Sequence, residues 1–152
     1  MSRLVVVDAS VVRAAGETEH PVSSACRNCL MAIRAICHRV ALTEPIRKEW
    51  GQHMSRFSRK WRRSMAAKQK PIAVISPKRL DLRWAAYSSA ARTAIKKDKG
   101  LLEAALATDH VIITLDDSLK QALAERPDGK DLLRNVQWIH PVRDGVAAIQ
   151  AL

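Results

Sequence analysis

The chain has 152 residues, a hydrophobic content of 47%, and 26 Lys and Arg residues against 15 Asp and Glu, which gives a formal net charge of +11. This length suits one domain and leaves no room for a second full core. The apolar runs are far shorter than the roughly 20 residues that cross a membrane, and the N-terminal residues lack the layout of a signal peptide. We therefore expect a soluble, cytoplasmic chain with no membrane partner.

The positive charge indicates the class of partner. An excess of Lys and Arg favours a polyanion, with nucleic acid first and an anionic membrane surface second. The aromatic content of 4% is low, which argues against base stacking as the main means of binding. The net charge by itself does not indicate which reaction the protein would catalyse.

Short apolar strands alternate with longer helical periods in the first half of the chain. The spacing predicts strands at 4–7 and 40–42, helices at 10–15 and 23–38, a helix from the Thr43 cap through Trp61, and a loop at 68–77 with a short strand at 72–75. Ser23 is the expected N-cap of the second helix. Cys26, Cys29 and Cys37 lack a fourth zinc ligand with finger-like spacing, so we interpret them as buried thiols.

The second half continues the alternation. The pattern predicts helices at 80–95, 98–108 and 118–125, strands at 111–115 and 136–139, a turn at 126–129, and a closing helix from 141 or 142. Such alternation is typical of an α/β domain, here with a mainly parallel sheet of four or five strands.

Four carboxylates are expected at one edge of that sheet. Asp8 and Asp116 end two predicted strands, and ligands bind at the carboxyl ends of parallel strands. Glu49 lies on the helix after the second strand, and Asp98 opens the helix before the strand of Asp116. Converging carboxylates repel each other unless a cation such as Mg²⁺ or Mn²⁺, which prefers oxygen ligands, offsets their charge. The pattern therefore indicates metal-assisted phosphodiester hydrolysis.

Helical geometry selects two of these acids from their neighbours. Glu44 and Glu49 are about 140° apart around a helix, so both cannot easily reach one ion. Glu49 flanks the apolar stripe, whereas Glu44 in the first turn suits the helix dipole. Asp98 shares a face with apolar residues, and Glu103 is interpreted as a surface acid.

Successive residues that leave a strand point to opposite sides, which separates Asp116 from Asp117. Asp116 faces the same way as Thr114, whose hydroxyl is placed to bond the carboxylate or its water. Asp117 is expected to cap the next helix or to lie just outside the site. A simpler alternative stays open, in which these acids only cap helices, as Asp8 would do with Ser10 bonding in the same turn.

Together these segments resemble the PIN-domain nucleases. The segments are "DAS" after the first strand, "LTEPIRKEW" with its Thr six residues before Glu49, "DKGLLEAALATD" and "IITLDD". Asp98 and Asp116 are eighteen residues apart, which suits that family. The resemblance covers essentially the whole chain, 1–152, in order and length.

The resemblance implies a three-layer α/β/α sandwich and an endoribonuclease that depends on Mg²⁺ or Mn²⁺. Asp8, Glu49, Asp98 and Asp116 would hold the metal directly or through water, and Ser10 and Thr114 would support them by hydrogen bonds. Many members of the family are toxins of bacterial toxin–antitoxin pairs, and dimers are common. RNA, an antitoxin protein and a second copy of the chain are therefore the implied partners.

The segment 53–70 is the most basic part of the chain. On a helix continuous with Glu49, Arg56 and Lys60 fall within about 20° of its direction, and we expect them to form a phosphate track. The alternative is a solvated helix face. Lys97 and Lys99 either contact phosphate near the cut or are surface lysines.

Two further interpretations bear on nucleic acid. Trp61 and Trp84 are candidates for stacking on bases, whereas Trp50 and Trp138 are expected in the core. The rival to a nuclease is a catalytically idle nucleic-acid-binding module on the same fold. A phosphoryl-transfer domain is disfavoured because "DAS" lacks a second acid two residues on, and the sequence has no GxGxxG after a strand and no GxxxxGK[ST].

Overall fold

The computed structural model describes residues 2–74 and 77–152. Within them, strands β1 to β5 form one fully parallel sheet in the order β3-β2-β1-β4-β5. The strands are β1 (Leu4–Val7), β2 (Arg39–Leu42), β3 (Pro71–Ala73), β4 (Val111–Ile113) and β5 (Gln137–Ile139). The predicted α/β class with a mainly parallel sheet is confirmed.

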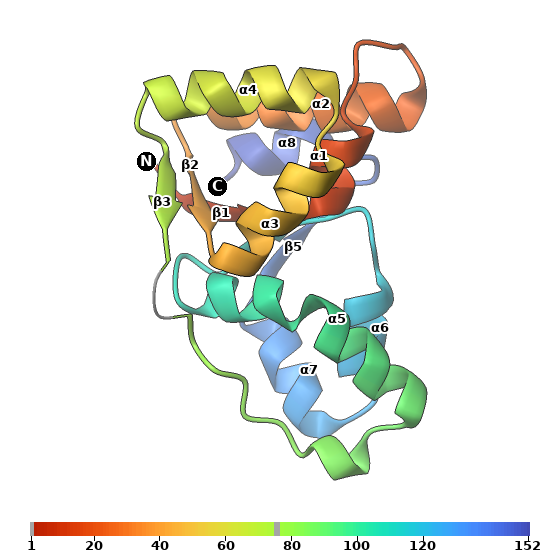
Figure 1. Ribbon diagram of the computed structural model, residues 1–152. Coiled ribbons are helices and arrows are strands. Elements are labelled where there is room, and N and C mark those ends of the chain that lie inside the picture. Colours follow the sequence, from red (N-terminus) through yellow and green to blue (C-terminus); the bar gives the residue numbers. More distant parts are fainter. Residues whose placement is uncertain (1, 75–76) are drawn as a thin grey trace.

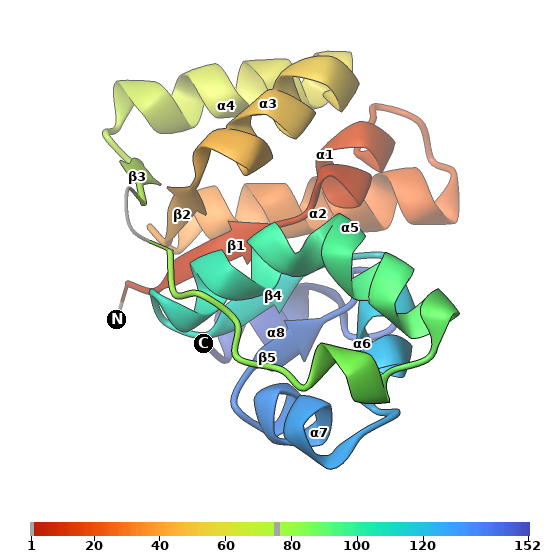
Figure 2. The same cartoon turned by 60° about the horizontal axis from the view of Figure 1, so that its bottom comes forward.

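Helices cover both faces of this sheet (Figures 1 and 2). They are α1 (Ala9–Ala14), α2 (Pro21–Ala35), α3 (Glu44–His53), α4 (Arg56–Ala67), α5 (Ser89–Leu106), α6 (Ser118–Leu123), α7 (Pro127–Arg134) and α8 (Gly145–Gln150), with a 3₁₀ turn at Trp84–Ala86. Helix α5 contacts β1, β2 and β4, and α2 packs against α8 behind the sheet in Figure 1. This arrangement agrees with the predicted three-layer α/β/α sandwich.

The centre of the sheet forms the core. Val5, Val6 and Val7 of β1 are fully buried, as are Ile112 and Ile113 of β4. A run of β-branched residues without polar alternation is typical of a parallel strand that is covered on both faces. The hydrophobic sequence of β1 therefore follows from its central position.

The direction of strand addition reverses at β1. This strand pairs with β2 on one side and with β4 on the other, with Val7 in register with Ile113. Such a topological switch point opens a crevice at the carboxyl ends of the two strands, where ligands bind in open α/β sheets. The residues directly after β1 and β4 thus lie side by side.

The predicted long helix from Thr43 through Trp61 is wrong, because the chain forms two helices there. Helix α3 ends before Met54, whose backbone is extended, and α4 begins after Ser55. The Ser55 hydroxyl caps α4 by accepting from the backbone N–H of Ser58 at 3.1 Å. Its own N–H donates to the carbonyl of Val12 in α1. This capping residue is the local signal that outweighed the continuing apolar period.

Helix α5 also differs from the prediction. It runs unbroken from its Ser88 cap, which accepts from the N–H of Ala91 at 3.1 Å. Asp98 therefore lies in the middle of one helix and does not open a second. The predicted helix at 80–95 begins only at Ser89, because the segment before it is irregular apart from the 3₁₀ turn.

Several other observed boundaries differ from the predicted ones. Helix α2 begins at Pro21 after His20, not after Ser23, and the predicted turn at 126–129 falls largely in α7. The closing helix begins at Gly145. The strand predicted at 72–75 begins at Pro71, and Ile75 lies outside the described residues.

The cysteine interpretation is right for two thiols and wrong for the third. Cys26 and Cys29 are fully buried, and burial raises the pKa of Cys26 to about 12 and that of Cys29 to about 11. Cys37 lies beyond the end of α2 and is exposed.

The side chain of His38 bridges the start of β1 and the last helix, α8, by hydrogen bonds. It is 1% exposed, its Nδ1 accepts from the N–H of Arg3 at 3.0 Å, and its Nε2 lies 3.2 Å from the carbonyl of Ile149. Because Nδ1 accepts, Nε2 carries the proton and donates to that carbonyl.

Replacing His38 by leucine should lower the free energy of unfolding by about 2–4 kcal/mol, because the buried carbonyl of Ile149 and the partly buried N–H of Arg3 both lose their partner. Urea denaturation measures this change. The exposed His20 makes no side-chain capping bond, so His20→Leu is the control. Equal stability of the two variants would contradict the assigned role.

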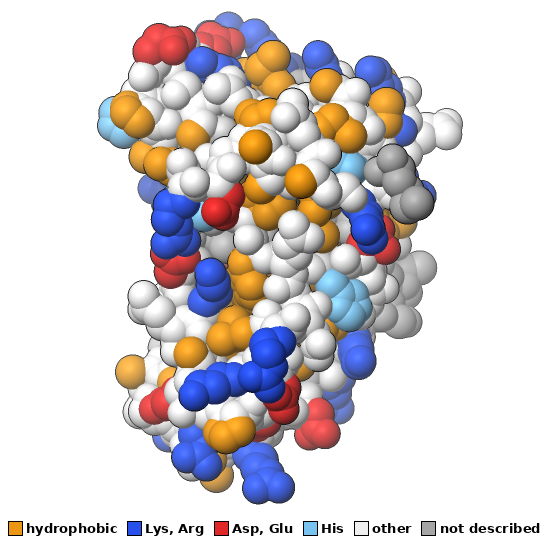
Figure 3. All heavy atoms as spheres, turned by 180° about the vertical axis from the view of Figure 1, so that it is seen from behind, with side chains coloured by type: hydrophobic (Ala, Val, Ile, Leu, Met, Phe, Trp, Pro, Cys, Tyr) orange, Lys and Arg blue, Asp and Glu red, His pale blue; other side chains and the backbone are white. Residues whose placement is uncertain are grey.

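No helix in the described part of the chain is both long enough and apolar enough to cross a membrane. On the face opposite to that of Figure 1, Lys and Arg side chains are spread over the surface among acidic and apolar ones (Figure 3).

Candidate active site

All four predicted acids line one depression at the topological switch point. It has a volume of about 210 Å³. Four segments supply the acids: Asp8 follows β1, Glu49 lies on α3, Asp98 on α5, and Asp116 follows β4. The complete lining is Asp8, Ala9, Ser10, Arg13, Glu49, His53, Lys97, Asp98 and Asp116.

Asp8 is the most firmly held of these acids. It is 7% exposed, and its Oδ2 accepts from the hydroxyls of Ser10 and Thr114, both at 2.7 Å. Hydrogen bonds from Ser10 and Thr114 to an acid are thus confirmed, but the Thr114 hydroxyl donates to Asp8 and not to the carboxylate of Asp116. The carboxylate of Asp8 makes no side-chain capping bond to α1, so the alternative of a simple cap is wrong for this residue. The two hydroxyl donors fix the orientation of this carboxylate.

Asp116 and Asp117 have different partners. Asp116 Oδ1 accepts from the N–H of Ser118 at 2.8 Å, and its N–H donates to the Thr114 hydroxyl at 3.0 Å. Asp117 accepts instead from Arg143 at 2.7 Å, and this hydrogen bond holds the pKa of Asp117 below its usual value.

Asp117 stands at the N-cap position of α6, as expected, but its side chain makes no capping bond, and the carboxylate of Asp116 accepts from the N–H of Ser118 instead. Asp117 is also absent from the described lining of the depression. Asp116 both lines the depression and caps α6.

The indole of Trp50 positions Glu49. Its Nε1 donates to the carbonyl of Val7 at 2.9 Å, which fastens α3 to the end of β1 beside Asp8. Glu49 itself is exposed and lines the depression. Glu44 lines a separate cavity with Leu42 and other residues near β3. The structure thus separates Glu49 from Glu44 as the helical geometry predicted.

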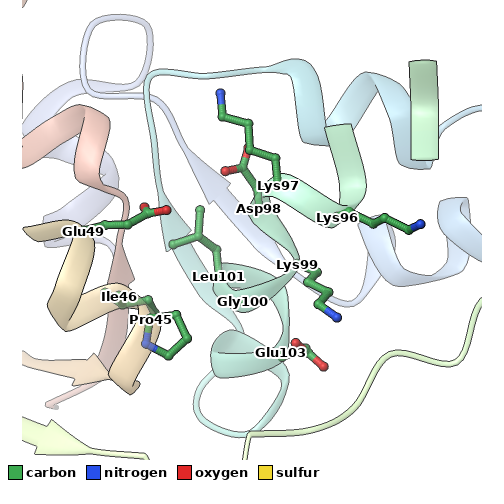
Figure 4. Close-up of a pocket in the computed structure, with 10 residues that line it drawn as sticks. All are labelled: Pro45, Ile46, Glu49, Lys96, Lys97, Asp98, Lys99, Gly100, Leu101 and Glu103. Carbon is green, nitrogen blue, oxygen red and sulfur yellow. The ribbon is translucent and has the colours of Figure 1, made fainter. Parts of the chain in front are cut away.

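The pKa of Asp98 is raised by its burial among the other acids. Burial, and then the charges of Asp8, Asp116 and Glu49, raise its pKa from 3.8 to about 6, while Lys97 partly opposes the rise. Figure 4 shows Glu49 reaching from α3 towards α5, where Asp98 is turned to the same side. The four acids therefore form one negatively charged unit, although they come from distant parts of the sequence.

Three cationic or titratable side chains share the depression with the acids. Lys97 was predicted to lie near the site, whereas Arg13 and His53 were missed. His53 stands four residues after Glu49 on α3, and this i,i+4 spacing was a usable signal. Arg13 is in the last turn of α1 and shows no comparable pattern.

The predicted phosphate track is not formed as expected. Arg56 and Lys60 lie on α4, not on the helix of Glu49, and neither lines the acidic depression. Lys60 lies 3.9 Å from the carboxylate of Glu17. Trp61 is 4% exposed and donates to the carbonyl of Leu30 at 2.7 Å, so it is not free to stack on bases.

The donor set suits Mg²⁺ or Mn²⁺ in its chemistry. All four acids offer the hard oxygen ligands that these ions prefer. As placed in residues 2–74 and 77–152, no three His, Cys, Asp or Glu side chains form a group close enough to hold a metal ion. Binding would require the side chains to move closer, and the exposed Glu49 has the most freedom to do so.

Comparison with known proteins adds no family assignment. No protein-family model matches the sequence, and a search of the curated proteins found no match.

Proposed function

We propose that the protein is a metal-dependent endoribonuclease of the PIN type. The observation that carries this proposal is the convergence of four carboxylates, from four segments, on one depression at the switch point of a parallel sheet. A structural role explains single acids at helix ends, but it does not explain why Glu49 and Asp98 face the same depression from two different helices.

The four acids would together hold the metal ion in this reaction. Asp8, held by Ser10 and Thr114, would be the fixed ligand, and Glu49, Asp98 and Asp116 would complete the set. The bound Mg²⁺ or Mn²⁺ would supply an activated water and offset charge on the phosphate. Arg13 and Lys97 lie in the same depression, where their charges suit the phosphates on either side of the cut.

The choice of RNA rests on the family resemblance together with the charge of +11. The same resemblance supports a cytoplasmic toxin that is neutralised by an antitoxin protein, and a homodimer. The rival is a nucleic-acid-binding module in which the acids do no chemistry.

Two pairs of neighbouring acids test the proposal with matched controls. In cleavage of a mixed RNA pool with Mg²⁺ or Mn²⁺, Glu49→Gln and Asp116→Asn should each lower the rate by about 100-fold or more, because even the outer partners of metal ligands contribute 10–100-fold. Glu44→Gln and Asp117→Asn should cleave like the wild type.

Several outcomes would overturn this assignment. Cleavage that survives both site substitutions, or that proceeds equally well in EDTA, would show that the four acids do not hold a metal for this reaction. RNA binding without cleavage under any condition would instead favour the idle binding module.

A further inference from the structure

The acidic depression is the first of three adjoining depressions that share lining residues. A second cavity of about 170 Å³ lies between α3 and α5, and a third of about 590 Å³ lies between α5 and the segment before it. The first and second share Glu49, Lys97 and Asp98, and the second and third share Lys96, Lys99 and Glu103. Taken in this order, the three depressions lead from the four acids across α5, and we refer to them together as the path.

The only glycine of α5, Gly100, lies among the residues at which the second and third cavities adjoin, next to Lys99 in the sequence. Gly100 lines the second cavity, between the apolar Ile46 of α3 and the lysines of α5 (Figure 4). A Cβ atom built on Gly100 would meet nothing within 4 Å. Glycine inside a helix costs roughly 1 kcal/mol relative to alanine, and packing within the chain does not require one here. Its absent side chain lets another molecule approach the helix closely.

The far end of the path combines an aromatic ring with cations. Trp84 is half-buried and lines the third cavity together with Arg79, Leu80, Lys96 and Lys99. An aromatic face beside positive charges is the arrangement on which unpaired bases stack while their phosphates are bound.

The segment that carries Trp84 is held firmly in place. The N–H of Lys78 donates to the carbonyl of Glu103 at 3.1 Å, and the N–H of Arg83 donates to Asp128 Oδ2 at 2.8 Å. Figure 2 shows this segment running beside α5 to the 3₁₀ turn. Two anchors on either side of Arg79 and Leu80 preorganise the surface, which lowers the entropic cost of binding.

We propose that this path binds one unpaired strand of nucleic acid, which crosses α5 at Gly100 and stacks a base on Trp84. The inference deepens the proposed function, on which it rests, because the acidic depression at the start of the path is where the strand would be cut. The Lys96 and Lys99 side chains on the crossing ridge suit the phosphates of the strand. The apolar wall formed by Pro45, Ile46 and Leu101 suits the flat face of a base.

Blocking the crossing point tests the path directly. Gly100→Leu adds a side chain to the ridge without a clash, and Gly51→Leu on α3 is the matched control, since a Cβ there also meets nothing within 4 Å. The probes are fluorescein-labelled single strands of RNA and of DNA with one sequence, and the corresponding RNA duplex. Fluorescence anisotropy in EDTA measures binding separately from cleavage.

Gly100→Leu should bind the single strands about 10-fold more weakly than the wild type, and Gly51→Leu should bind like the wild type. The affinity of Trp84→Ala for the single strands should be about 5- to 100-fold lower than that of the wild type, which is the range found for one stacked base. Trp84→Phe should keep most of the affinity. Thermal unfolding confirms that each variant is folded, and the two substitutions test the path independently. The RNA and DNA arms show whether the ribose hydroxyl contributes.

The outcomes separate this inference from the proposed function. Unchanged strand binding by both Gly100→Leu and Trp84→Ala would overturn the path, even if the wild type cleaves RNA. Loss of binding in both variants, with no cleavage by the wild type in any metal, would support the path and overturn the nuclease. Tighter binding of the duplex than of the single strand, or binding of neither, would contradict an unpaired strand as the occupant.

Discussion

Asp98→Asn is expected to stabilise the protein at neutral pH while abolishing cleavage and the effect of metal. Burial first, and then the charges of three other acids, raise the pKa of the Asp98 carboxyl from 3.8 to about 6. Such a rise corresponds to at most about 3 kcal/mol of destabilisation at pH 7. Solvent screening of this half-buried group reduces the expected gain in the free energy of unfolding to about 1–2 kcal/mol.

The pH dependence has a definite sign. Between pH 4 and 6 the folded protein holds a proton on Asp98 that the unfolded chain has released, so the free energy of unfolding of the wild type falls as the pH rises through this window. Asp98→Asn lacks this contribution. The two proteins should therefore have similar stability near pH 4 and differ most above pH 6, as measured by urea denaturation in EDTA.

Metal should reverse the order of the two proteins. Mn²⁺ at about 100 times its dissociation constant would stabilise the wild type by about 2.7 kcal/mol, whereas Asp98→Asn should respond weakly and lose at least about 100-fold in cleavage. Glu44→Gln should respond to Mn²⁺ like the wild type. A wild type whose melting temperature ignores Mn²⁺, or an Asp98→Asn variant that responds equally, would contradict a metal site at the four acids.

Gly129→Ala is expected to have the largest effect on stability. Gly129 lies in the first turn of α7, where a Cβ atom would stand 2.0 Å from the carbonyl oxygen of Leu123 and 2.5 Å from the hydroxyl of Tyr87. The first of these is backbone at the end of α6, so it cannot rotate away. Overpacking of this kind costs about 1–3 kcal/mol and occasionally more, and we expect about 3 kcal/mol.

Stability is the property that the substitution affects most directly, because the atoms that the new Cβ would meet belong to Leu123 and Tyr87 and not to any of the four acids. The melting temperature should fall by about 6–12 °C, given about 2–4 °C per kcal/mol for a chain of this size. Gly51→Ala, at the unobstructed glycine of α3, should be neutral or stabilising by up to about 1 kcal/mol. A melting temperature of Gly129→Ala within 1–2 °C of the wild type would show that α6 and α7 separate easily.

The Gly129 clash also bears on the segment that carries Trp84. Asp128, the preceding residue, accepts from the N–H of Arg83 and, at 2.6 Å, from the hydroxyl of Tyr87. Burial and this hydrogen bond raise the pKa of Tyr87. Displacing the start of α7 would therefore loosen the far end of the proposed strand path as well.

Prediction succeeded where a short-range signal and the tertiary structure agree. The apolar run before Asp8 predicts a buried strand, and the Thr43 cap with Pro45 predicts a helix start, which the structure has at Thr43, whose hydroxyl accepts from the N–H of Ile46. The carboxyl-end rule for parallel strands then brings Asp8 and Asp116 together without knowledge of any contact. The preference for Glu49 over Glu44 follows from the same local geometry.

Prediction failed where two local signals competed. The apolar period from Ile46 to Trp61 continues through Ser55, but the Ser55 hydroxyl offers a cap, and the bond from its N–H to Val12 of α1 favours the break. In α5 the polar run around Asp98 suggested a helix start, yet the buried Ile95 and Leu102 on either side keep one helix intact. In the first case the deciding partner, Val12, is distant in the sequence, and in the second the burial of Ile95 and Leu102 in the folded core decides.

The sequence by itself determined the class of fold, the edge of the sheet at which the acids gather, and the bond from Ser10 to Asp8 two residues before it, because strand alternation and residue spacing act over short range. Only the tertiary structure decided which partner each acid has. The carboxylate of Asp117 accepts from Arg143, twenty-six residues away, and the carboxylate of Asp116 accepts from the N–H of Ser118 at the start of α6. It also decided that Arg13 and His53 enter the depression and that Trp84 lies at the end of a path across Gly100. Apart from the i,i+4 spacing of Glu49 and His53, these features depend on packing between segments that are distant in the sequence.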